Sequence, residues 1–100
     1  MPKQDRQNEL LEQDQVREPP MYKVLLHNDD YTPMDFVVHV LVTIFNQPEA
    51  EAAKIMLSVH HKGHGLCGVF AYEIAETKVA QVEHAATANG YPLKCTMEPE

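Results

Sequence analysis

The stretch from residue 21 to residue 27 alternates apolar side chains with side chains of mixed character. Tyr22, Val24 and Leu26 form the apolar row, and lysine, leucine and histidine occupy the positions between and after them. An apolar residue at every second position is typical of a strand that packs one face on a core. We therefore predict a first strand over residues 22–27.

A helix is predicted next, first by its start signal and then by its apolar spacing. Thr32 supplies a hydroxyl suited to an N-cap, Pro33 fits the first helical position, and Asp35 places an acid in the first turn. The apolar residues that follow at helical spacing are Val37, Val38, Leu41, Ile44 and Phe45. The sequence thus predicts a helix that begins at Pro33 with Thr32 as its cap.

A second helix is predicted after Asn46-Gln47-Pro48-Glu49, which repeats this start signal with a weaker cap. Its apolar stripe consists of Ala52, Ile55, Met56 and Val59. Gly63 follows the stripe, and glycine readily takes the left-handed conformation that closes a helix. We expect the helix to end just before this glycine.

Three further elements complete the pattern. A short apolar run at residues 65–71 predicts a second strand, although it contains two glycines. A third helix, ended by Asn89-Gly90, is predicted by the helical spacing of Ala75, Val79, Val82 and Ala86. After Pro92, the alternation of Leu93, Cys95 and Met97 with polar residues predicts a last strand with one exposed face.

The order of these elements, β-α-α-β-α-β, defines the fold class. A chain this short buries one shared core most readily when its helices cover a single face of its sheet. We predict an α+β two-layer sandwich, in which a three-stranded antiparallel sheet carries three helices on one face.

Composition divides the chain into an extension and one domain. Residues 1–18 hold few large apolar side chains and lead into Pro19-Pro20, so they cannot offset the entropy cost of ordering. We predict a disordered N-terminal extension over residues 1–20 and one core domain over residues 21–100. A total of 100 residues with 44% hydrophobic content leaves no room for a second domain.

Charge and cysteine content exclude several classes of function. The formal charge of -7 lacks the clustered Lys and Arg that bind nucleic acid or an anionic membrane surface, so neither partner is expected. Cys67 and Cys95 have no CxxC spacing and lie in apolar segments, which indicates two buried thiols. With no apparent leader and no membrane-spanning apolar run, the expected location is the cytoplasm.

The candidate chemistry is concentrated in Asn28-Asp29-Asp30, which lies between the first strand and the first helix. Carboxylate and amide oxygens accept hydrogen bonds from an ammonium group, and none of them is an activated nucleophile. The segment therefore favours capture of a cation over bond making. Considered alone, such a segment is more often a turn with helix-capping acids than a ligand site.

Two other kinds of site, a metal site and a hydrolase active site, find little support in the sequence. His60, His61 and His64 crowd near Cys67, but adjacent histidines on a helix cannot easily face one metal ion. A small hydrolase that uses His60 with Asp30 lacks a nucleophile and an oxyanion hole in the sequence. We expect no metal, no cofactor and no catalytic residue.

Four segments of the chain resemble one known family. They are Asn28-Asp29-Asp30-Tyr31-Thr32-Pro33-Met34, Met56-Leu57-Ser58-Val59-His60, Cys67-Gly68-Val69-Phe70 and Ala75-Glu76-Thr77-Lys78-Val79-Ala80. In this order they look like ClpS, the adaptor of the bacterial ClpAP protease. The resemblance extends from about Met21 to Glu98, whereas the N-terminal extension matches only in its length and in ending at prolines.

The resemblance implies a site for the first residue of a substrate protein. ClpS adaptors recognise proteins with an N-terminal Leu, Phe, Tyr or Trp. The residues that the resemblance assigns to the substrate's α-amine are Asn28, Asp29, Asp30 and His60. Those assigned to the pocket for its side chain are Thr32, Met34, Val37, Val38, Met56, Val59 and Leu93. Met34 is then the guard that excludes β-branched residues from the pocket.

The resemblance also implies partners. Substrates are delivered to the ClpA unfoldase of ClpAP, whose N-terminal domain is contacted by the residues matching Glu73 and Lys78. The N-terminal extension matches the segment that engages the unfoldase during delivery. Such a protein is an adaptor and not an enzyme. The competing interpretation is a translation-factor or ribosomal-stalk-like binding domain, because the C-terminal domain of the stalk protein has a similar element order.

Overall fold

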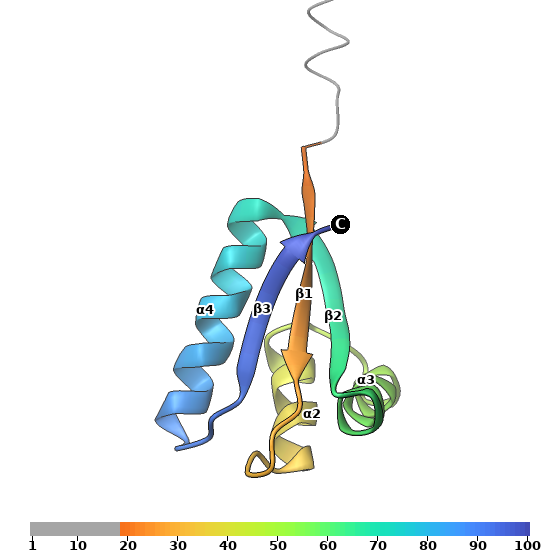
Figure 1. The fold of residues 1–100 in the computed structure, drawn as a ribbon, viewed down its shortest axis with the longest axis vertical. Coiled ribbons are helices and arrows are strands. Elements are labelled where there is room, and N and C mark those ends of the chain that lie inside the picture. The colour runs from red at the N-terminus through yellow and green to blue at the C-terminus, as the bar shows by residue number, and fades with distance from the viewer. Residues whose placement is uncertain (1–18) are drawn as a thin grey trace, which may run out of the picture.

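The computed structural model describes residues 19–100, which fold into a three-stranded sheet backed by three helices (Figure 1). The elements are β1 (Met21–His27), α2 (Met34–Thr43), α3 (Glu49–Lys62), β2 (His64–Ala71), α4 (Tyr72–Ala88) and β3 (Lys94–Pro99). The predicted order β-α-α-β-α-β is confirmed. The part of the predicted extension that precedes Pro19 lies outside the described residues.

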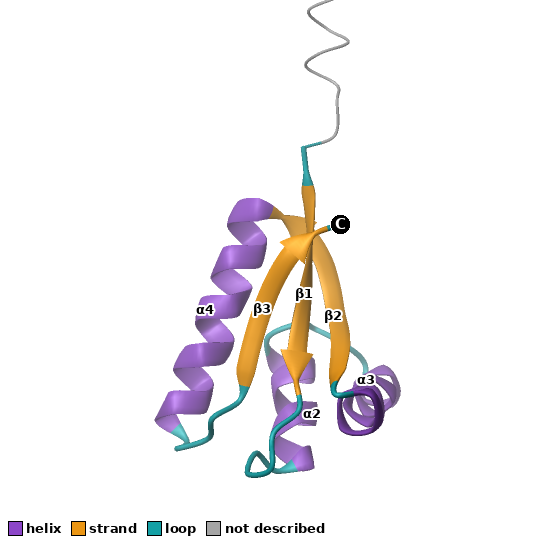
Figure 2. Ribbon diagram, in the orientation of Figure 1, coloured by secondary structure: helices purple, strands orange, loops and turns teal. Residues whose placement is uncertain are grey.

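Strand β1 occupies the centre of the sheet, and both neighbours run antiparallel to it in the order β2-β1-β3. Leu26 on β1 pairs with Gly65 on β2 and with Cys95 on β3. Val24 and Leu26 are fully buried, as the alternating pattern predicted. They belong to a core cluster to which all three helices contribute, so the predicted two-layer sandwich is confirmed (Figure 2).

A β-bulge interrupts the pairing of β1 with β2. The partners shift from Val24 with Gly68 to Leu25 with Leu66, so Cys67 is the extra residue. Cys67 is 1% exposed, and its burial raises the pKa of the thiol well above the usual range. Burial, assisted by Glu83, likewise raises the pKa of Cys95 to about 12. Both cysteines are free, buried thiols, as predicted.

The predicted C-terminal ends of α3 and α4 match the structure, whereas the predicted N-terminal cap of α2 does not. Gly63 caps α3 with a left-handed φ of 90°, and α4 ends at Asn89 as predicted. The predicted cap of α2 is wrong by one residue: Pro33 is the N-cap, and its carbonyl accepts from Phe36 N at 3.1 Å. The Thr32 hydroxyl does not cap the helix because it donates to Asp29 instead.

Helix α4, the longest in the described part of the chain, packs against all three strands. Its buried side chains are the small or β-branched residues Ala75, Val82 and Ala86, which let the helix lie close to the sheet. No helix within residues 19–100 is both long enough and apolar enough to cross a membrane.

Candidate functional site

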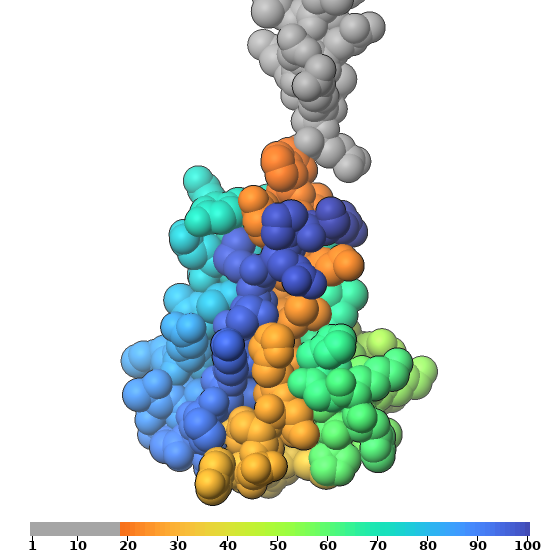
Figure 3. Space-filling view, in the orientation of Figure 1, coloured from red at the N-terminus to blue at the C-terminus, as the bar shows by residue number. Residues whose placement is uncertain are grey.

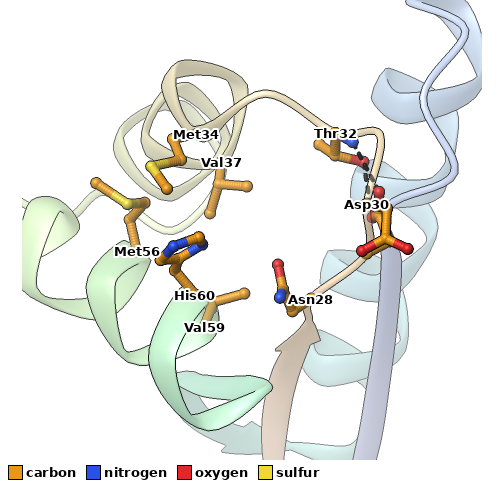
Figure 4. Close-up of a pocket in the computed structure, with 9 residues that line it drawn as sticks. Asn28, Asp30, Thr32, Met34, Val37, Met56, Val59 and His60 are labelled. Carbon is orange, nitrogen blue, oxygen red and sulfur yellow. Dashed lines mark hydrogen bonds between the residues drawn. The ribbon is translucent and has the colours of Figure 1, made fainter.

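A hollow of about 270 Å³ opens beyond the C-terminal end of β1, between α2 and α3 (Figure 4). One side is polar and comes from the loop that joins β1 to α2, together with one residue of α3. The other side is apolar and comes from the two helices. The lining residues are Asn28, Asp29, Asp30, Thr32, Met34, Val37, Met56, Val59 and His60.

The loop between β1 and α2 is fixed to the end of α3. Asn28, the first residue after β1, donates its backbone N–H to the carbonyl of Gly63 at 2.9 Å. Gly63 is the left-handed cap that closes α3, so its carbonyl is available outside the helix. This bond holds the polar loop beside the helix that carries His60.

Asp29 organises the rest of the loop. Its Oδ1 accepts the backbone N–H groups of Tyr31 at 2.8 Å and Thr32 at 2.7 Å, and its Oδ2 accepts the Thr32 hydroxyl at 2.8 Å. Partial burial opposes ionisation of the carboxyl, but these three hydrogen bonds outweigh it and lower the pKa of Asp29 below its usual value. The loop therefore presents a charged carboxylate at neutral pH.

The apolar wall comes from two pairs of residues at helical spacing. Met34 and Val37 lie three residues apart on α2, and Met56 and Val59 lie three residues apart on α3, so each pair shares one helix face. The valines form the floor, with exposed fractions of 6% and 3%. Met34 is 43% exposed and lies at the entrance.

Asn28 and His60 complete the polar side with groups that the fold itself does not use. Figure 4 shows both side chains turned toward the space bounded by the methionines and valines. Within residues 19–100, neither side chain makes a hydrogen bond, although the His60 ring packs edge-to-face on His61 with centroids 5.1 Å apart. The site thus offers an amide oxygen, carboxylates and an imidazole beside an apolar wall.

Two residues expected in the pocket do not line the hollow. Leu93 is 5% exposed and belongs to the core cluster, where it precedes β3. Val38 is half-buried and packs against the same core, because it lies about 100° around α2 from Val37. Both side chains lie outside the surface of the hollow.

The two residues expected to contact ClpA have different environments. Glu73 is exposed in the first turn of α4. Lys78 is half-buried, and its Nζ donates to the carbonyl of Ile44 at 2.6 Å, where α2 ends. Helix α2 has no basic residue of its own in its last turn, so Lys78 supplies a cation to that C-terminus. Sequence reasoning missed this contact because 34 residues separate the partners.

No group of three His, Cys, Asp or Glu side chains in the described part of the chain is placed to hold a metal ion. The histidines near Cys67 therefore do not form a ligand set there. What the site can do chemically is accept hydrogen bonds from a cation and bury an apolar group next to it.

Comparison with known proteins identifies relatives of this chain. The family described as ATP-dependent Clp protease adaptor protein ClpS matches residues 17–96. An ATP-dependent Clp protease adapter protein ClpS from Nitratidesulfovibrio vulgaris is 57% identical over 98 residues, which are 98% of each chain. One from Syntrophus aciditrophicus is 59% identical over 86 residues, covering 86% of this chain and 80% of the relative.

A solved structure shares the fold. It is that of Agrobacterium tumefaciens ClpS2 bound to L-phenylalaninamide, with a TM-score of 0.80 and 40% sequence identity. The match covers 83% of this chain and all of the other.

Proposed function

The chain belongs to the ClpS family of adaptor proteins of the ATP-dependent Clp protease. From this premise we propose that it captures substrate proteins through an N-terminal Leu, Phe, Tyr or Trp and delivers them to ClpAP. The observation that carries the proposal is the hollow at the end of β1, which joins acceptors for an ammonium group to an apolar wall. L-phenylalaninamide, the ligand of the related Agrobacterium protein, combines an aromatic side chain with an α-amine.

The substrate's α-amine is assigned to the polar side of the hollow. An α-amine has a pKa of about 7.7 to 8.0, so at neutral pH it is mostly an ammonium with three donors. We assign these donors to the Asn28 oxygen, the carboxylates of Asp29 and Asp30, and a ring nitrogen of His60. Asp29 keeps capacity for this role because its Oδ2 accepts a single hydrogen bond from residues 19–100.

The first side chain of the substrate is assigned to the apolar side. Burial of a Leu or Phe side chain contributes about 1.5–3 kcal/mol. Thr32, Met34, Val37, Met56 and Val59 contact it directly in this proposal, and the flexible methionines adapt to branched and aromatic shapes. Val38 and Leu93 support the wall from the core behind it.

Met34 is assigned the role of guard. A β-branched residue such as Ile is bulky next to its own backbone, so it meets the entrance of the pocket before it reaches the floor. Met34 is the lining methionine with the large exposed fraction, 43%, whereas Met56 is half-buried. Its place at the entrance supports the assignment.

A binding titration tests the mechanism. Peptides that begin with Leu, Phe, Ile or N-acetyl-Leu are compared with the full chain by fluorescence anisotropy. We expect Leu and Phe peptides to bind, and acetylation to weaken binding at least about tenfold, because it removes the charge of the ammonium and two of its three donors. Equal affinity for the acetylated peptide would refute the amine site.

The guard is tested with a matched pair of variants. Met34→Ala is expected to raise affinity for the Ile peptide relative to the Leu peptide, because the entrance widens. Leu57→Ala is the control, since Leu57 has a similar exposed fraction of 46% and does not line the hollow. An unchanged Ile-to-Leu ratio in Met34→Ala would remove Met34 from the role of guard.

The partner in this proposal is the N-terminal domain of ClpA, and Glu73 and Lys78 lie at the contact. The complex acts in the cytoplasm. It forms no covalent bond to the substrate and binds no nucleic acid. Tethering a substrate to the protease raises its effective concentration there. Glu73→Lys is expected to weaken binding to the ClpA N-terminal domain, whereas Glu83→Lys, an exposed acid later on the same helix, is the control. Equal effects of the two variants would argue against a contact at Glu73.

A further inference from the structure

The face of the sheet that carries no helix forms a surface of three cross-strand rows. Register places Leu66, Leu25 and Thr96 side by side in the central row. The row toward the pocket end holds His64, His27 and Lys94, and the opposite row holds Val69, Lys23 and Glu98. Figure 3 views the molecule onto this face, with β1 between β3 and β2. We call these nine residues the open sheet face.

The charge of the open sheet face differs from that of the rest of the molecule. Residues 19–100 contain ten acidic residues and five lysines. Two of these lysines, Lys23 and Lys94, lie on the face, and a third, Lys62, lines a hollow at its β2 edge. Glu98 is the acid among the nine positions. An acidic protein thus concentrates its lysines around one exposed surface.

The titratable residues of the face reflect the same environment. His27 accepts or donates one hydrogen bond with the Thr96 hydroxyl at 2.7 Å. Burial, followed by the charges of Lys94 and His64, lowers the pKa of His27 below its usual value. A neutral imidazole is therefore favoured, and the lysines carry the positive charge at neutral pH.

The centre of the face is apolar and hollowed. Leu66 is 46% exposed and lies opposite half-buried Leu25. These two leucines line a hollow of about 280 Å³ where the end of α3 meets β2, and its polar lining residues are Lys23, Ser58, Lys62, His64 and Glu98. The patch is small: a stable complex between separate proteins buries about 1,200–2,000 Å² in total. It suits a short segment that is already tethered nearby.

The sequence ahead of residue 19 contains a segment with the complementary pattern. Leu10 and Leu11 are adjacent and are flanked by Glu9 and Glu12. Nine residues lie between Leu11 and Met21, and the ten steps of chain that join them reach about 33 Å when extended. From Met21 to Leu25 the distance along β1 is about 13 Å, so the reach is ample.

We propose that the Glu9-Leu10-Leu11-Glu12 segment docks on the open sheet face of its own chain, with the leucines against Leu25 and Leu66 and the acids beside Lys23 and Lys62. Two leucines and two exposed ion pairs are too few for tight binding between separate molecules. A short tether gives an effective concentration in the millimolar range, which makes such a weak contact sufficient. The inference does not depend on the proposed pocket for a substrate terminus.

Paramagnetic relaxation in the full chain tests the docking. A nitroxide is attached to Asn8→Cys, and Cys67 and Cys95 stay unlabelled because they are 1% and 4% exposed and their thiol pKa values are raised. We expect strong broadening of the amide signals of Leu25 and Leu66 and little at His84, which is exposed on α4 and lines a separate hollow with Thr43 and Ile44. The broadening should be lost when Leu10 and Leu11 are both replaced by serine. It should also weaken between about 0.01 M and about 1 M NaCl, as the Debye length falls from about 30 Å to about 3 Å.

Matched charge variants provide the control. Lys62→Glu is expected to reduce the broadening, whereas Lys54→Glu, a reversal at an exposed position on the same helix, leaves it unchanged. Broadening as strong at His84 as at Leu66, or broadening that survives the double serine variant, would overturn the proposal. The proposal would also be overturned if a nitroxide on one chain broadened the signals of a second, isotope-labelled chain that carries no nitroxide. That result would identify a second copy of the chain as the occupant.

Discussion

Replacement of Asp29 by alanine probes how the polar loop beside the hollow is held. The change removes the acceptor of three hydrogen bonds, from Tyr31 N, Thr32 N and the Thr32 hydroxyl, at 2.8, 2.7 and 2.8 Å. It leaves the backbone bond from Asn28 to Gly63 in place. The loop is therefore expected to loosen between Asp29 and Thr32 and to stay attached at its first residue.

The magnitude follows from the type and exposure of these bonds. A hydrogen bond to a charged group contributes about 1.5–3 kcal/mol when both partners leave water. Here Tyr31 is exposed and Asp29 is only half-buried, so water replaces part of what is lost. We expect Asp29→Ala to lower the free energy of unfolding by about 2–3 kcal/mol, less than the sum of three bonds. Thr32→Val, which removes the hydroxyl bond alone, should cost about 1 kcal/mol.

The pH dependence of the same difference supplies a second, independent test. The folded state lowers the pKa of Asp29, whereas the unfolded chain has a carboxyl pKa of about 3.9. The stabilisation is therefore fully present above about pH 4 and is lost as the pH falls through the lower folded-state pKa. The gap between wild type and Asp29→Ala should narrow as the pH is lowered below about 4.

Urea unfolding followed by circular dichroism measures both quantities. With a slope of about 1–3 kcal/mol/M for a small domain, the expected loss moves the midpoint by about 1–2 M at neutral pH. A midpoint within error of wild type would show that the loop keeps its shape without the carboxylate. A gap of constant size from neutral pH to pH 3 would show that the charge of Asp29 is not what stabilises it.

Three further predictions concern residues around the hollow and the sheet. Gly65→Ala should destabilise the fold by about 1–3 kcal/mol, because the new Cβ would lie 2.7 Å from Val59 Cγ2 and 3.0 Å from the Ile55 carbonyl oxygen. Thermal unfolding measures this loss, and a weaker peptide affinity would show that Val59, part of the apolar wall, has moved. Lys78→Met should cost about 1–2 kcal/mol through loss of the bond to Ile44, and an unchanged unfolding midpoint would contradict this. The folded state lowers the pKa of His27, so wild type should lose stability as the pH drops through about 6.5, the pKa of an unfolded histidine. His27→Asn should reduce this loss, and an equal dependence of unfolding free energy on pH in both proteins would refute the prediction.

Local pattern was sufficient for most of the fold. Apolar residues at every second position, Val24 and Leu26 among them, predicted the buried face of β1, and both of these side chains are fully buried in the structure. Gly63 marked the end of α3 because a left-handed residue is needed there, and its φ is 90°. Such signals depend on a residue and its near neighbours, which is why they can be recognised in a sequence.

Local pattern failed where a side chain had two possible partners. Thr32 precedes Pro33 as an N-cap residue would, yet its hydroxyl donates to Asp29, and the proline becomes the cap. The grouping of the candidate site residues came from family resemblance, and the structure brings nine of the eleven into one hollow while leaving Val38 and Leu93 outside it. Which neighbour of a helical residue faces a cavity depends on how that helix is rotated on the sheet.

The sequence by itself determined the six elements, their order, and the kinds of groups available: acceptors after β1, apolar residues at helical spacing on α2 and α3, and two cysteines in buried strands. Only the tertiary structure decided which of these groups meet. The bond from Lys78 to Ile44 joins residues 34 positions apart, and the bulge at Cys67 sets which side chains share the open sheet face. The physical reason is that periodicity and capping act over a few residues, whereas contacts between elements follow from the packing of the whole core.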